Sequence, residues 1–141
     1  MTSVRGRRLM SFVLAAAAGS LVTAAVDRAA FGQQDGVKRT ILRRVPDPGN
    51  PNYEIVMAIA ELGPGGSSGK HRHPGVEVGY LLEGSLIIEH DGRPVATLKA
   101  GDSLTNDNTA VHNARNPNTT PTRVLAVYVV DKSKPLAEPV K

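Results

Sequence analysis

The chain has 141 residues, of which 40% are apolar, so it can form one compact domain with a small core but not two full domains. It contains no cysteine, which excludes disulfides and thiolate metal ligands, so any bound metal must be held by nitrogen and oxygen. Its formal charge of +4 supports nucleic-acid binding only if the basic residues lie within the folded domain.

The N-terminal segment, residues 1–32, resembles an export signal. Arg5, Arg7 and Arg8 precede an uncharged, alanine-rich run over residues 9–26, and small residues suited to cleavage follow it. The adjacent arginines weakly resemble a twin-arginine signal. The alternative is an uncleaved membrane anchor, because about 18 apolar residues are the minimum for a span. The modest hydropathy of Ala, Gly, Ser and Thr argues against that alternative.

Cleavage after Gly32 would change the net charge. The leader holds four of the 17 basic residues and one of the 13 acidic residues, so the remaining chain carries a net charge of about +1. A nearly neutral domain gives no electrostatic support to nucleic-acid binding. The sequence therefore predicts an exported protein, periplasmic or secreted, that binds no nucleic acid and contacts no membrane after signal removal.

From Lys38 onward, short β-rich segments are separated by turn residues, and no apolar stripe of helical length is present. The first of these segments cover residues 39–45 and 53–62, and the last covers residues 123–130. About eight strands separated by turns at short intervals predict an all-β sandwich or barrel. A jelly roll is favoured because it pairs most of its strand edges.

Two local features complete the expected domain, which covers residues 33–131. Asp91-Gly92 predicts a two-residue hairpin turn, since glycine tolerates the positive φ that such a turn needs. The last residues, 132–141, are polar and contain two prolines, so they are expected to form a loose tail or a strap on a partner subunit.

A histidine-rich stretch, KHRHPGVE, holds three candidate metal ligands. Residues two apart in an extended strand share a face, so His71, His73 and Glu77 have the same parity. A bend or bulge at Pro74-Gly75 would let the carboxylate come back beside the two imidazoles. Three nitrogen and oxygen ligands can therefore converge from one short segment.

His112 is a fourth candidate ligand, provided that the fold brings its strand beside the others. A solvated surface loop is the simpler alternative, in which Glu77 pairs with Lys70 or Arg72. The two basic residues have the opposite parity to the histidines and are expected to point outward. His90, just before the hairpin turn, is expected to be exposed and without a function.

The spacing of the histidine-rich stretch resembles the first sequence motif of the cupin family. Gly65, His71, His73, Glu77 and Gly84 are separated by five, one, three and six residues, which matches the motif at every position. The two glycines are expected to serve turns rather than chemistry.

The second cupin motif is matched in part. Gly101, His112 and Asn116 stand at the family positions, whereas Asp107 and Thr109 replace the usual proline and glycine. The loop before the histidine is therefore expected to differ in shape. Asn116 is expected to order its own loop by hydrogen bonds from its side chain to the backbone.

The resemblance covers residues 38–131 and implies a single cupin jelly-roll barrel that holds one divalent transition metal ion. The ligands it implies are His71, His73, Glu77 and His112. Three imidazoles and one carboxylate suit Mn, Fe, Co, Ni, Cu or Zn, and the donor types do not select among these metals.

Three functions agree with such a site. Similarity to cupin dioxygenases of the quercetin-cleaving type implies a metal-dependent oxidoreductase that acts on a small oxygen-rich substrate, with Glu77 as ligand and general base. The second function is a non-catalytic cupin that binds a small ligand or the metal itself. The third is a metal-dependent isomerase or lyase for a sugar or keto acid. A homodimer is expected, because strands such as 39–45 or 123–130 could add to a neighbour's sheet.

Overall fold

The computed structural model describes residues 33–34 and 36–141, and the predicted export signal over residues 1–32 lies outside them. The described residues form eleven strands: β1 Gln33–Gln34, β2 Val37–Pro46, β3 Tyr53–Leu62, β4 His71–Arg72, β5 Gly75–Glu83, β6 Ser85–His90, β7 Ala96–Lys99, β8 Ser103–Asn106, β9 His112–Arg115, β10 Thr122–Asp131 and β11 Glu138–Pro139. In this part of the chain, no helix is long and apolar enough to cross a membrane.

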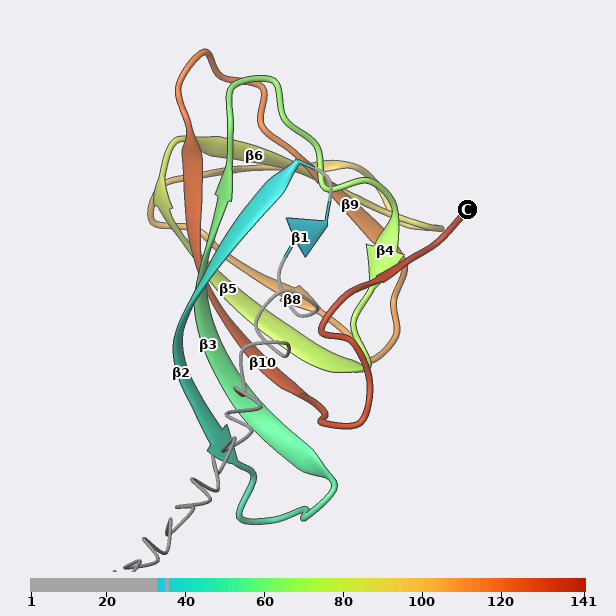
Figure 1. Ribbon diagram of the computed structural model, residues 1–141. Coiled ribbons are helices and arrows are strands. Elements are labelled where there is room, and N and C mark those ends of the chain that lie inside the picture. Colours follow the sequence, from blue (N-terminus) through green and yellow to red (C-terminus); the bar gives the residue numbers. More distant parts are fainter. Residues whose placement is uncertain (1–32, 35) are drawn as a thin grey trace, which may run out of the picture.

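The strands form two antiparallel sheets on opposite sides of one core (Figure 1). One sheet has six strands in the order β1-β2-β3-β10-β5-β8, and the other has five in the order β11-β4-β9-β6-β7. The predicted all-β jelly roll is therefore confirmed. The structure has more strands than the eight expected, because β1, β4 and β11 have only two residues each.

The core lies between the sheets and is built by the alternation of side chains along the long strands. In β10, every second residue from Thr122 to Val130 is buried, and the inward residues of β3 follow the same pattern from Val56 to Leu62. Leu86 and Ile88 of β6 contribute to the same core from the opposite sheet. The functional residues described below lie among these apolar side chains.

The predicted hairpin turn at residues 91–92 forms, but the strand pairing beyond it is shifted by one residue. The N–H of Arg93 donates to the carbonyl of His90 at 3.2 Å, which closes the turn. The ladder between β6 and β7 pairs Ile88 with Ala96, one residue later than a two-residue loop requires. The proline that follows Arg93 has no N–H for the ladder, so β7 begins only after it.

The chain crosses from the smaller sheet to the larger sheet between His73 and β5. Gly75 packs so tightly on β10 that a Cβ at this position would lie 2.0 Å from the carbonyl oxygen of Val129. Only glycine fits at such a close approach. The bend expected at Pro74-Gly75 is therefore the point where the two sheets are connected, and it places Glu77 opposite the histidines.

The expectation of a loose C-terminal tail is wrong. β11 pairs with β4 of the same barrel, and the N–H of Val140 donates to the carbonyl of Lys70 at 2.9 Å. The side chain of Leu136 is buried in the core with 3% exposure. The burial of Leu136 thus fixes residues 132–141 on the barrel, although the charges and prolines of this segment are typical of a solvated tail.

Candidate metal centre

Three histidines of the smaller sheet converge inside the barrel. His71 of β4 pairs across the strands with His112 of β9, and His73 follows directly after β4. Each of the three side chains is buried with 2% exposure. One ring nitrogen of each lies within 4.8 Å of the others, so the cluster can hold a metal ion.

Hydrogen bonds to the backbone fix the tautomer of each ring. Each Nδ1 faces a carbonyl oxygen, which can only accept a hydrogen bond, so each Nδ1 carries the proton. The carbonyl partners are Gly69 for His71, Leu136 for His73 and Ala110 for His112, at 2.9, 2.6 and 3.0 Å. Each Nε2 therefore presents a lone pair, and the carbonyls hold the rings as outer-sphere partners do around bound metals.

Glu77 of β5 reaches the same cluster from the larger sheet. Its carboxylate is buried, and Oε2 lies 3.2 Å from Nε2 of His73 and 3.6 Å from Nε2 of His112. The four predicted ligands are thus brought together. Strand parity predicts the direction of each side chain, but the convergence depends on two facing sheets rather than on one bent strand.

The atoms at the centre of this cluster fit a cation. Nε2 of His73 is buried and has no hydrogen-bond partner among the described residues, although it lies 3.2 Å from a carboxylate oxygen. A lone pair and a carboxylate at this distance repel each other unless a proton or a cation lies between them. The donor set of imidazole nitrogens and one carboxylate suits a divalent transition metal.

The protonation states also suit metal binding. Burial, followed by the neighbouring His112 ring, lowers the pKa of His71 to about 3, and burial also lowers the pKa of His112. Burial alone would raise the pKa of Glu77, but contacts with His73, His112 and Asn106 hold it well below its ordinary value. At neutral pH, the imidazoles of residues 71 and 112 are neutral and the carboxylate of residue 77 is ionised, which are the states that metal coordination requires.

Asn106, at the end of β8, is a site residue that the sequence motifs do not reveal. Its Nδ2 donates to Oε2 of Glu77 and lies 2.9 Å from Nε2 of His112. Its Oδ1 accepts a hydrogen bond from Nε2 of His90 at 2.7 Å. His90 is half-buried, so the expectation that it is exposed is wrong. The sequence does hold one indication that Asn106 points inward: it lies two residues after Leu104 in the same strand, and residues two apart share a face.

The basic residues around the histidines pair elsewhere on the surface. Lys70 contacts Asp91 at 2.8 Å, and Arg72 contacts Glu138 at 2.9 Å. Both basic side chains are exposed, as their parity predicts. The alternative of a solvated loop in which Glu77 pairs with one of them is therefore wrong.

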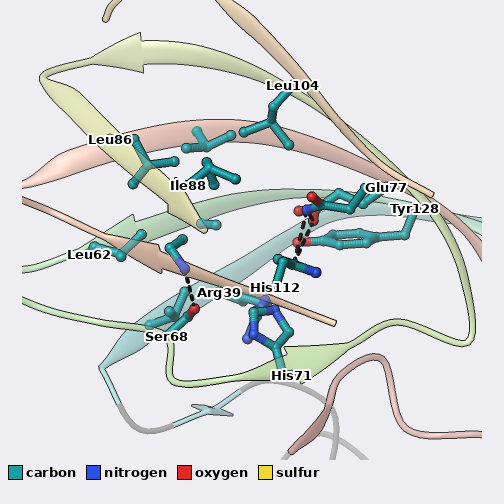
Figure 2. A pocket seen from close by; sticks show the side chains of 15 residues that line it. Arg39, Leu62, Ser68, His71, Glu77, Leu86, Ile88, Leu104, His112 and Tyr128 are labelled. Carbon is teal, nitrogen blue, oxygen red and sulfur yellow. Dashed lines mark hydrogen bonds and ion pairs between the residues drawn. The ribbon is translucent and has the colours of Figure 1, made fainter. Parts of the chain in front are cut away.

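His71, Glu77 and His112 lie at the polar end of a cavity that opens to solvent (Figure 2). Its lining is mostly apolar: Val37, Ala60, Leu62, Leu86, Ile88, Leu104, Ala114 and Val124. Tyr128 is fully buried, and its ring centre lies 4.9 Å from that of His73. Burial, followed by the charge of Glu77, raises the pKa of this tyrosine above its ordinary value.

The family model described as "Cupin domain" matches residues 58–128, about half of the chain, and this match includes all four predicted ligands. The chain belongs to the cupin family. A comparison with curated proteins gives no match.

Solved structures with the same fold include three bacterial proteins of low sequence identity. A cupin superfamily protein from Desulfitobacterium hafniense is 15% identical, with a TM-score of 0.56 over 71% of this chain and 83% of that one. DMSP lyase DddQ from Ruegeria pomeroyi is 19% identical, with a TM-score of 0.61 over 74% of this chain and 51% of the lyase. KdgF from a Halomonas species is 19% identical, with a TM-score of 0.57 over 70% and 83%. At these identities the likeness shows the cupin fold alone.

The second motif of this cupin departs from the family at Thr109, yet the backbone keeps a conformation typical of glycine. Thr109 has a φ of 61°, in the left-handed region that β-branched residues disfavour. Asp107, at the usual proline position, pairs with Arg93 at the surface. Asn116 orders its loop as predicted, and its Nδ2 donates to three carbonyl oxygens, those of Leu62, Gly63 and Thr120.

Proposed function

We propose that this cupin is a metal-dependent enzyme that acts on a small oxygen-rich substrate, with a dioxygenase-like reaction as its chemistry. The observation that carries the proposal is the approach of the His73 Nε2 lone pair to the Glu77 carboxylate at 3.2 Å, beside a cavity that opens to solvent. That contact calls for a proton or a cation, and the three convergent imidazoles favour a metal ion.

Each residue of the site would have a distinct role in the proposed reaction. His71, His73 and His112 would hold the ion through Nε2, with Glu77 as the anionic ligand. When bound, a divalent transition metal acts as a Lewis acid toward a substrate oxygen and, if redox-active, allows reaction with O2. Glu77 is the carboxylate in position to accept a substrate proton. Its low pKa makes it a weak base while Asn106 donates to Oε2, so proton transfer is favoured when that hydrogen bond lengthens.

The same ligands would also serve a lyase or isomerase that acts on a sugar or keto acid without O2. The similarity in fold to a protein described as a DMSP lyase supports keeping this second candidate. A cupin that binds a small ligand without turnover is the third candidate, because one barrel supports many functions.

One experiment separates the three. The metal-loaded full chain is incubated with small hydroxy and keto compounds while O2 is followed with an electrode and products by mass spectrometry. Oxygen uptake that depends on a substrate supports the proposed reaction, whereas product without O2 uptake supports a lyase or isomerase. Ligand binding with no product supports a binding protein. His112→Ala should abolish turnover, while Asn113→Ala in the same strand, whose side chain contacts Ser67 and Glu89, should retain it.

We also propose that the protein acts outside the cytoplasm, on the basis of the basic, alanine-rich leader over residues 1–32. The test is the N-terminal sequence of the protein recovered from the periplasm or the culture medium. A new N-terminus near Gly32 supports export with cleavage. Recovery of the intact chain from the cytoplasm contradicts it.

A further inference from the structure

Arg39 lines the cavity of the metal centre. It lies in β2 opposite Ala60 of β3, whose side chain is buried and points into the barrel. Arg39 is itself half-buried, and it shares the cavity wall with His71, Glu77 and His112. Among the described residues that line this cavity, Arg39 is the only arginine or lysine and Glu77 is the only carboxylate.

Arg39 and the predicted metal ligands line one and the same cavity. His71, Glu77 and His112 share its wall with Arg39, and the buried Tyr128 completes this part of the lining. A ligand that fills the cavity would therefore contact the guanidinium as well as the histidines.

The charge balance of the loaded site calls for an anion. Arg39 contributes +1, Glu77 contributes −1 and a divalent ion would contribute +2, so the centre would carry about +2 in a cavity with no other charged lining residue among those the structure describes. A guanidinium suits a carboxylate in particular, with which it can form two parallel charged hydrogen bonds.

We propose that Arg39 binds the carboxylate of the substrate, so that the substrate class is a small hydroxy or keto acid whose second oxygen faces the histidine cluster. This inference rests on the proposed metal-dependent function and narrows its substrate. Arg39 would decide which acids bind and which substrate atom lies next to Glu77, whereas the histidines and Glu77 would decide whether metal binds.

The test compares matched acids and neutral analogues on Zn²⁺-loaded full chain. Calorimetry measures the binding of pyruvate against methyl pyruvate and of glycolate against glycolamide. We expect the acids to bind more tightly than their neutral partners. In Arg39→Met this preference should fall by roughly 10- to 100-fold, because a charged hydrogen bond contributes about 1.5 to 3 kcal/mol. Arg44→Met, at an exposed arginine of the same strand that pairs with Glu54, is the matched control and should bind like the wild type.

The two proposals fail in different ways. If the wild type binds no Zn²⁺ by elemental analysis, the metal-dependent function fails. If the wild type and Arg39→Met both bind one ion per chain but discriminate equally between the acids and their neutral partners, the role of Arg39 is overturned. The same holds if the loaded wild type prefers none of the acids.

A second observation concerns the outer face of the larger sheet. Three successive cross-strand rows of β3, β10 and β5 carry only apolar side chains on this face. The rows are Ile59, Leu125 and Tyr80; Met57, Val127 and Val78; and Ile55, Val129 and Val76. Val78 and Tyr80 are 50% and 48% exposed, which is unusual for neighbouring apolar side chains on the surface of a monomer.

Polar residues flank most of this apolar face. Thr40 and Arg43 flank two of its rows on β2, where the exposed Val45 extends the third, and Ser103 and Thr105 flank it on β8. The row beyond Leu125 is charged, and in it Arg123 forms ion pairs with Glu61 and Glu83. An apolar centre within a polar rim is the usual composition of a protein interface.

We infer that this face binds a second copy of the chain, sheet against sheet. With strands about 4.8 Å apart and rows about 6.8 Å apart, the apolar centre and its rim cover roughly 650 Å², close to the ~800 Å² per partner of a standard stable interface. The end row has one arginine against two glutamates, a net charge of −1, which disfavours a nucleic acid as the partner. The homodimer would thus form through faces, not through the strand edges expected from the sequence.

Light scattering on the full chain tests this inference. The wild type should have twice the mass that mass spectrometry gives for the denatured chain, and Val78→Glu should have the single mass. Val95→Glu is the control, because Val95 is 62% exposed in the loop before β7 and should leave the dimer intact. A cooperative thermal transition in both variants shows that they fold. A monomeric wild type, or a Val78→Glu variant that remains dimeric, overturns the inference.

Discussion

Acidification should destabilise the metal-free protein, chiefly through the buried histidines. The pKa of His71 falls from 6.5 in the unfolded chain to about 3 in the folded chain. Between these two pH values, the unfolded chain therefore binds more protons than the folded chain. Stability is therefore complete above pH 6.5 and is lost as the pH falls towards 3. The depressed pKa of His112 adds to the loss in the same direction.

The size of the effect follows from the pKa of His71. Between about pH 7.5 and pH 5.5, the linkage relation gives a loss of about 1.4 kcal/mol from this residue alone. For a domain of this size, that corresponds to a fall in melting temperature of roughly 5 to 10 °C. Glu77 has a depressed pKa, so its protonation affects stability only below the ordinary pKa of a glutamate. The change in stability between about pH 7.5 and pH 5.5 therefore reports on the histidines.

The assay is thermal unfolding of the full chain stripped of metal with a chelator, at several pH values across that window. His71→Asn is the control variant, because the asparagine amide can replace Nδ1 as the donor to Gly69 without titrating. Its melting temperature should fall less on acidification. Equal melting temperatures of the wild type at both pH values, or an equal fall in the variant, would refute the reasoning.

Three further predictions test the backbone and the outer sphere of the site. Gly75→Ala should cost several kcal/mol in urea unfolding, because its Cβ would meet the Val129 carbonyl at 2.0 Å, while Gly63→Ala, with nothing within 4 Å, should be tolerated. Thr109→Gly should raise the free energy of unfolding by roughly 0.5 to 1 kcal/mol, because it relieves a left-handed φ; an unchanged or lower value would contradict this. Asn106→Ala should weaken metal affinity by roughly 10- to 100-fold in a chelator competition, since it removes the donor to Glu77; Asn113→Ala, which lacks that contact, should not.

The sequence predicts the ligand set because spacing and parity are local properties. His71, His73 and Glu77 point inward, and Lys70 and Arg72 point outward, as the alternation of a strand requires. The resemblance to the cupin motifs adds His112, which no local rule could connect to residues some forty positions earlier.

The residues that the sequence does not reveal depend on contacts between distant strands. Asn106 and Arg39 enter the site because β8 pairs with β5 and β2 pairs with β3, and neither pairing has a sequence signature. His90 becomes part of the site through one hydrogen bond to Asn106. The tail packs on the barrel through Leu136, whose carbonyl also orients His73, although the composition of the segment is that of a solvated tail.

The central claim is that the four residues of this cupin hold one divalent metal ion. Elemental analysis of the full chain, purified and then dialysed against a mixture of Mn, Fe, Co, Ni, Cu and Zn salts, tests it most directly. We predict one ion per chain in the wild type and a large loss in His112→Ala, with Asn113→Ala unchanged. A wild type without stoichiometric metal, or a His112→Ala variant that retains it fully, would contradict the claim.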